Sequence, residues 1–234
     1  MDTRKQDFKE GFKLGLPIGI GYFCVSMAFG MMVKNAELPI WMALFISATN
    51  LTSAGQFAGL NLMCMHAGYV EIALTEVMIN LRYALMSLSL SQKVKSGMTR
   101  LQRALMSFGI TDEIFAVSLI RDEISFLFFV GIWFPAFVGW TLGSVTGAAF
   151  SSILPHQVAD AMNIALYAMF IAILMPQFRE DPNKRKAILL SILLSLVFTY
   201  VPFLQMNEGW RIIIITLLAS AVMAYFYPIQ EDVQ

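Results

Sequence analysis

The chain has 234 residues and a formal net charge of zero, with 58% hydrophobic and only 14% charged residues. Soluble domains carry roughly a quarter charged residues, so this composition excludes an ordinary soluble domain, and the charge balance gives no indication of nucleic acid binding. Several apolar runs approach the roughly 20 residues that a spanning helix needs, which predicts an all-α, polytopic integral membrane protein in the lipid bilayer.

Eight hydrophobic segments are expected along the chain, separated by short charged stretches rather than by linkers or soluble domains. They cover residues 14–33, 39–66, 70–91, 105–120, 124–148, 157–177, 187–204 and 211–227. We therefore predict one transmembrane domain over residues 1–234, with seven to eight segments.

Small and polar residues interrupt the first two segments. In the first, Pro17 and Gly19 could kink the helix and let another helix approach. In the second, the stretch SATNLTSAGQFAGLNLM at 47–63 places Ser, Thr, Asn and Gly where a continuous apolar helix is expected. This predicts a broken helix near Thr52–Gly55 that faces a polar cavity, where freed backbone groups bind substrate or ions. The alternative is tight helix packing through small residues.

The third segment contains charged residues within EVMINLRYALMSLSL. An arginine inside a spanning helix costs at least a few kcal/mol, so Arg82 should face the protein interior and have a partner. Glu76, Asn80 and Tyr83 share a different face of the same helix. The arginine could belong to a functional site, or to a structural ion pair that joins helices.

The fourth segment supplies two acids in GITDEIFAVSL. Thr111 could cap a helix that begins at Asp112, with Glu113 in its first turn. Either acid could neutralise Arg82 or carry a proton, because an acid in a partly apolar cavity has a raised pKa. Adjacent helical residues point about 100° apart, so we expect one structural acid and one proton-coupled acid. The alternative is a solvated pair at a membrane edge.

Internal similarity suggests two related halves of three segments each, followed by extra helices. NLRYALMSLSL is echoed by NIALYAMFIAIL, and the same offset aligns Gly55 with Gly139 and Gly59 with Gly143. Chance similarity between apolar helices is the alternative. The predicted halves are residues 10–91 and 105–178, and the extra helices lie in 187–227.

Three basic clusters constrain the topology, because basic loops favour the cytoplasmic side. Eight simple crossings cannot place all three clusters there, so either one loop violates this rule or one segment in each half does not cross. The long, glycine-interrupted segments 39–66 and 124–148 are the candidates for re-entry. The clusters are Arg4, Lys5, Lys9 and Lys13; Lys93, Lys95, Arg100 and Arg103; and Arg179, Lys184, Arg185 and Lys186.

Four stretches in this order, GLPIGIGYFCVSMAFG, SAGQFA, NLRYALMSLSL and GITDEIFAVS, resemble the AzlC family of branched-chain amino acid permeases over roughly residues 10–175. The resemblance implies export of small hydrophobic amino acids such as valine, or methionine, across the inner membrane. It also implies a partner, a small membrane protein of the AzlD (YgaH-like) family. The matching positions are Pro17, Gly19, Gln56, Asn80, Arg82, Thr111, Asp112 and Glu113.

One departure from the family pattern concerns the sixth segment. The resemblance implies an aspartate there, whereas this chain has Asn163. Any coupling role of that acid would have to fall to another residue, with nearby Asp160 as one candidate.

Residues and resemblance together predict a secondary transporter that exports branched-chain amino acids, driven by an ion, proton or substrate gradient because no ATP-binding motif occurs. No cofactor or metal is expected. Alternatives are a channel or transporter for another small solute, a non-transporting subunit of a two-component complex, and a membrane-embedded enzyme, for which no nucleophile–base pair is visible. The expected substrate-binding residues are Gly55, Gln56, Phe57, Asn80, Arg82 and Tyr83, and the expected coupling residues are Glu76, Asp112 and Glu113.

Overall fold

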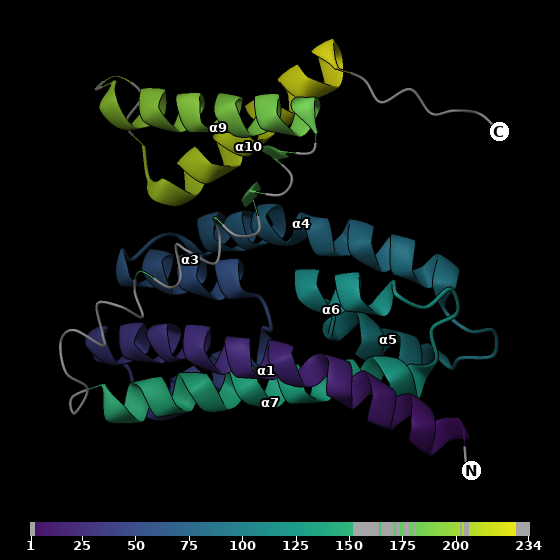
Figure 1. Ribbon diagram of the computed structural model, residues 1–234. Coiled ribbons are helices and arrows are strands. Elements are labelled where there is room, and N and C mark those ends of the chain that lie inside the picture. Colours follow the sequence, from purple (N-terminus) through teal and green to yellow (C-terminus); the bar gives the residue numbers. More distant parts are fainter. Residues whose placement is uncertain are drawn as a thin grey trace. The chain divides into compact units, whose positions relative to one another are not determined.

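The computed structural model describes residues 3–151, 181–201 and 206–227, together with residues 164, 171, 174–175, 178–179 and 203. Throughout this part of the chain the regular structure is helical, apart from an isolated bridge between Val94 and Ile124. The predicted all-helical class is therefore confirmed there. The helices in Figure 1 are α1 (Thr3–Asn35), α2 (Ile40–Thr49), α3 (Ser53–Cys64), α4 (Tyr69–Lys93), α5 (Arg100–Phe108), α6 (Asp112–Ser118), α7 (Phe126–Phe150), α9 (Pro182–Tyr200) and α10 (Glu208–Phe226).

Three described helices are long and apolar enough to cross a membrane, and they cover Arg4–Asn35, Phe126–Phe150 and Gly209–Phe226. The predicted count of seven to eight segments is not confirmed. Two of the expected segments are broken into short helices, and most of the segment 157–177, with Asp160 and Asn163, lies outside the described residues.

The chain forms two compact units. One contains Met1–Leu60 and Ile79–Leu166, and the other contains Asn61–Met78 and Tyr167–Gln234. In the second unit, α9 packs against α10, and Gly209 of α10 lies against Glu71 and Thr75 of α4. The residues that line the candidate site all lie in the first unit.

Helices α1 and α7 lie side by side over most of their length and run in the same direction (Figure 1). The backbone of Gly11 contacts Phe128, Gly19 contacts Pro135, and Gly30 contacts Ser144, so residue numbers rise together along both helices. Glycines at the crossing points allow backbones to approach this closely, as in other membrane helix pairs. Gly19 thus has the predicted helix-contacting role.

Residues 124–148 were a candidate for re-entry because glycines were expected to interrupt the helix. That premise is wrong, because α7 is one unbroken helix. Its Gly139 and Gly143 contact the α1 backbone at Gly19 and Phe23, and they do not form a break like the one near Gly55. Glycine spacing alone does not distinguish a helix break from a helix contact. Packing through small residues, offered above as the alternative for residues 47–63, therefore describes α7.

A methyl group on the contact face of α1 should loosen the α1–α7 pair. A Cβ at Gly30 would collide with the Ser144 carbonyl oxygen, whereas a Cβ at Gly21 meets nothing within 4 Å. We expect Gly30→Ala to lower the unfolding temperature in detergent by about 5 °C, because overpacking costs about 1–3 kcal/mol. Gly21→Ala on the same helix is the matched control and should change the unfolding temperature little. Equal effects of both variants would argue against backbone contact.

Helices α2 and α3 form one broken segment that turns back on itself. Ser47 of α2 is hydrogen-bonded to Ser144, near the C-terminal end of α7. Leu51, in the break, packs deeper in the core with Tyr22, and Leu60 of α3 then packs with Val33 near the C-terminal end of α1. The predicted break is confirmed, but it occupies residues 50–52, and Gly55 is helical.

Helices α5 and α6 form a second broken segment, which enters from the opposite end of the α1–α7 pair. Gln102 of α5 shares a cavity with Arg4 at the start of α1. Thr111, the last residue of the break at 109–111, reaches Tyr22 in the middle of α1, and Arg121 returns to Asp7 near the start of α1. The second broken segment is therefore this one rather than 124–148.

The second half of α4 runs opposite to α1 and α7. Tyr83 lies beside Tyr22 and Trp140, which are central in their helices, whereas Val94 pairs with Ile124, just before α7 begins. Arg82 is therefore held at the depth at which both breaks occur.

Candidate functional site

The two breaks and α4 meet around a small interior cavity of about 10 Å³. A space of this size holds about one water molecule. The polar groups around it come from α1, α3, α4, α7 and the α5–α6 segment, which is the arrangement expected of a site rather than of a simple helix contact. Its lining residues are Tyr22, Leu51, Ser53, Tyr83, Thr111, Asp112, Glu113 and Trp140.

Arg82 forms an ion pair with Asp112, which is one of the residues that line this cavity. Its Nη1 lies 2.9 Å from Asp112 Oδ2, and the side chains are 35% and 21% exposed. Arg82 Nη2 also donates to the Tyr83 hydroxyl at 3.1 Å. The predicted pairing of Arg82 with an acid of the fourth segment is thus confirmed, and Asp112 is the partner. Arg82 is partly rather than fully buried.

Thr111 places both acids at the start of α6. It is the N-cap of this helix, and its Oγ1 accepts a hydrogen bond from the Ile114 backbone N–H at 3.3 Å. The predicted cap is therefore confirmed. Because Asp112 and Glu113 are the first two helical residues, they point to different partners, and their charges are favoured at this helix end.

Glu113 is hydrogen-bonded to Tyr22 rather than to Arg82. Tyr22 is 8% exposed, and its hydroxyl oxygen also lies 2.7 Å from Thr111 Oγ1. A phenol has one proton to donate, so donation to an ionised Glu113 leaves the Tyr22 oxygen to accept from Thr111. The ring of Tyr22 packs edge-on against Trp140, with centroids 5.2 Å apart. One face of the site is therefore apolar and the other carries two acids.

Gln56, an expected substrate-binding residue, lies in a separate closed ring of hydrogen bonds. Trp140 Nε1 donates to Gln56 Oε1 at 3.0 Å, and Gln56 Nε2 donates to Ser47 Oγ at 3.2 Å. The Ser47 hydroxyl donates to Ser144 Oγ at 2.7 Å, and Ser144 donates back to the Trp140 carbonyl at 3.1 Å. Since Gln56 is 2% exposed, this ring joins the α2–α3 segment to α7.

Removing the Gln56 amide should destabilise the fold. Gln56→Met leaves the Trp140 N–H without an acceptor and removes the donor to Ser47 Oγ, which costs about 1–3 kcal/mol for buried groups. We expect a clearly lower unfolding temperature for purified Gln56→Met, while the equivalent change at exposed Gln6 on α1 should be nearly silent. An unchanged unfolding temperature in both variants would show that the ring contributes nothing to stability.

Other expected site residues do not line the cavity. Gly55 is buried within α3, and Phe57 packs edge-on against Phe29, with ring centroids 5.4 Å apart. Asn80 lies on α4 just before Arg82, and Glu76 lies in the part of α4 that belongs to the second unit. Tyr83 does line the cavity.

Tyr22 and Trp140 are cavity residues that the sequence reasoning missed. Each lies in an otherwise apolar run, where an aromatic side chain with a polar atom is expected to have a buried hydrogen-bond partner. That expectation could have identified them as candidates. Within the described residues, no three His, Cys, Asp or Glu side chains gather where they could hold a metal ion.

Comparison with known proteins places the chain among membrane proteins. Residues 17–154 match the family described as AzlC protein. The "Inner membrane protein YgaZ" of Escherichia coli K12 is 29% identical over 75% of this chain and 75% of that protein. An "Uncharacterized membrane protein" of Helicobacter pylori J99 is 26% identical over 77% of this chain and 79% of its own length.

A further "Uncharacterized membrane protein", from Archaeoglobus fulgidus, is 26% identical over 74% of this chain and 76% of its own length. No solved structure matches the chain. The family match covers more than half of the 234 residues. With its long apolar helices and its membrane relatives, the chain is a membrane protein that belongs to the AzlC protein family.

Proposed function

We propose that this protein is a secondary transporter that exports branched-chain amino acids, such as valine, across the inner membrane. The observation that carries the proposal is the Arg82–Asp112 ion pair at the meeting point of two broken helices. Charged residues and helix breaks inside membrane domains mark substrate and ion pathways in transporters. The resemblance to amino acid permeases supplies the substrate class.

The polarity of the site suits a zwitterion with an apolar side chain. Arg82 can bind a carboxylate, because a guanidinium donates two parallel hydrogen bonds to such a group. Glu113 can bind the ammonium group, and Trp140 and Leu51 offer an apolar wall. Substrate binding would then replace part of the Arg82–Asp112 and Glu113–Tyr22 contacts.

A cavity of about 10 Å³ cannot hold an amino acid, so the lining must part during transport. The α1–α7 pair is in backbone contact along its length, which makes it the rigid element. The α2–α3 and α5–α6 segments are shorter and broken, and they are therefore the elements that we expect to move.

Charge balance favours proton coupling through one of the two acids. With Arg82, Asp112 and Glu113 all ionised, the site carries one net negative charge. Because Asp112 is already paired with Arg82, Glu113 is the acid that can gain a proton without breaking an ion pair. A proton bound there would make the site neutral overall.

The test is a flux assay in proteoliposomes that contain the purified chain, alone and together with an AzlD-type partner. We expect counterflow of labelled valine that unlabelled leucine and isoleucine reduce and that lysine and glutamate do not. Flux only with the partner would make the two proteins a joint transporter. No competition by any branched-chain amino acid would refute the substrate assignment.

A further inference from the structure

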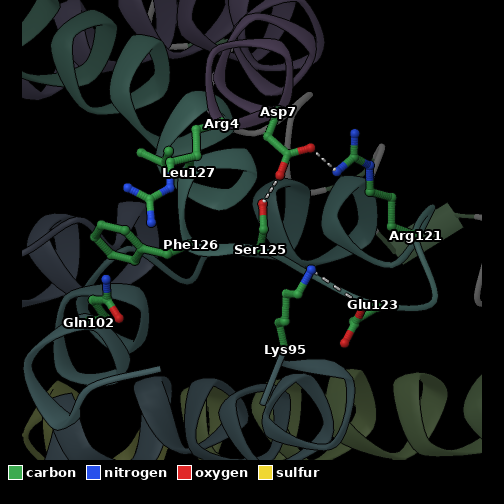
Figure 2. Close-up of a pocket in the computed structure, with 9 residues that line it drawn as sticks. All are labelled: Arg4, Asp7, Lys95, Gln102, Arg121, Glu123, Ser125, Phe126 and Leu127. Atoms are coloured by element: carbon green, nitrogen blue, oxygen red, sulfur yellow. Dashed lines mark hydrogen bonds and ion pairs between the residues drawn. The ribbon is translucent and has the colours of Figure 1, made fainter. Parts of the chain in front are cut away.

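A second, larger polar cavity of about 810 Å³ lies where α1 and α7 begin. Figure 2 shows Arg4, Phe126 and Gln102 on one side of it and Lys95 with Glu123 on the other. Arg4 and Tyr22 are eighteen residues apart on α1, or about 27 Å at 1.5 Å per residue. This cavity is therefore distinct from the site around Arg82.

Of the two acids that line this cavity, Asp7 is the less exposed, and internal contacts already satisfy it. Asp7 accepts from Arg121 Nη1 at 2.8 Å and from the Ser125 hydroxyl at 2.5 Å. Arg121 also pairs with Glu10, at 2.6 Å. These contacts, drawn in part in Figure 2, leave Asp7 little capacity to hold a cationic ligand.

The groups that remain available are hydrogen-bond donors. Arg4 takes part in no ion pair or hydrogen bond within the described part of the chain. Gln102 uses its Oε1 to accept from the Thr99 backbone N–H, so its amide nitrogen is left to donate. Lys95 is 59% exposed and lies 4.0 Å from Glu123, a weak contact that a ligand can replace. Two cations and an amide donor suit an anion with several oxygen atoms.

The surroundings strengthen the preference for an anion. Four basic residues precede residue 14, and four more lie between residues 93 and 103, with no acid among that second group. Because α1 and α7 are parallel, the positive ends of both helix dipoles also lie at this cavity.

The apolar part of the lining indicates where the anion comes from. Phe126 and Leu127 line the cavity, and they are the first two residues of a helix long and apolar enough to span the membrane. The cavity therefore borders the level at which lipid headgroups meet acyl chains. A free phosphate ion would use the donors but not this apolar edge.

We propose that the cavity between Arg4, Lys95 and Gln102 binds the phosphate of an anionic phospholipid headgroup, with the acyl chains against Phe126 and Leu127. Basic pockets at helix ends recognise such headgroups in other membrane proteins.

The test compares two double variants with the same change in charge. Arg4→Gln/Lys95→Gln alters the cavity, whereas Lys5→Gln/Lys9→Gln removes two exposed cations that do not line it. Each protein is placed in nanodiscs of phosphatidylcholine with rising fractions of phosphatidylglycerol, and unfolding temperature and co-purifying lipid are measured. A parallel series adds inorganic phosphate to pure phosphatidylcholine nanodiscs.

We expect phosphatidylglycerol to stabilise the wild type and the Lys5/Lys9 variant. The Arg4/Lys95 variant should bind this lipid about 30-fold more weakly, because each basic residue contributes about 1 kcal/mol to the binding free energy. Equal weakening in both variants would show diffuse attraction rather than a site, and so overturn the proposal. Equal stabilisation by inorganic phosphate would assign the cavity to a free anion instead. No response of the wild type to either ligand would also overturn it.

Discussion

Arg82→Leu is expected to abolish valine efflux from proteoliposomes. The variant removes the proposed carboxylate ligand and leaves Asp112 without its ion-pair partner. Losing one partner of a hydrogen-bonded charge pair costs about 2–5 kcal/mol, so efflux should fall by about 30-fold or more. Arg82→Lys keeps the charge but not the planar fork, and it should retain a small part of the activity.

The matched control is Lys93→Leu, at the end of the same helix. Lys93 lies 3.8 Å from Asp122, whose side chain is fully exposed, so the same loss of positive charge there should leave efflux close to wild type. To separate assembly from transport, each variant is compared at equal amounts of folded protein. Efflux by folded Arg82→Leu at the rate of the control would remove Arg82 from the mechanism.

Asp112→Asn and Glu113→Gln are expected to fail in different ways. Asp112→Asn leaves Arg82 without its acid, so we expect a loss of about 2 kcal/mol in stability and poor expression. This loss is smaller than for a fully buried ion pair, because both side chains are partly exposed. Glu113→Gln keeps a hydrogen-bonding side chain beside Tyr22 but cannot exchange a proton. That variant should fold, and because it also removes the proposed ammonium ligand, it should transport valine more slowly and without dependence on the pH gradient.

Tyr22→Phe is the companion variant for this test, because it removes the hydrogen bond to Glu113 and keeps the ring against Trp140. It should shift the pH at which efflux is half-maximal while the response to the gradient persists. If Glu113→Gln still follows the pH gradient as the wild type does, the proton is carried elsewhere. If both acid variants behave alike, the division of roles between them is wrong.

The features predicted from the sequence are those with a strong local cause. The cost of a charge in the membrane predicted a partner for Arg82, and the order Thr-Asp-Glu predicted the cap at Thr111. The polar stretch around Thr52 predicted a break, which the structure places at residues 50–52. Each of these follows from residues close together in the sequence.

The features that were missed depend on distant partners. The glycines of α7 are compatible with either a break or a contact, and only their position against α1 decides between them. Tyr22 bonds to Glu113, ninety-one residues away, and Gln56 bonds to Trp140, eighty-four residues away. No periodicity within one helix contains that information, so Gln56 was expected to bind substrate although it lies in a structural ring.

The shared direction of α1 and α7 determines which membrane face each loop occupies. A chain that crosses a membrane in the same direction in both helices must cross back between them, and the second half of α4 runs the opposite way. The α2–α3 and α5–α6 segments each return to the face from which they start. The basic clusters at residues 4–13 and 93–103 therefore share one end of the α1–α7 pair, which is the arrangement that the positive-inside rule favours. Arg82 is approached by one hairpin from each end of the α1–α7 pair. In the transporter proposed above, opening either hairpin alone would connect Arg82 to one compartment at a time.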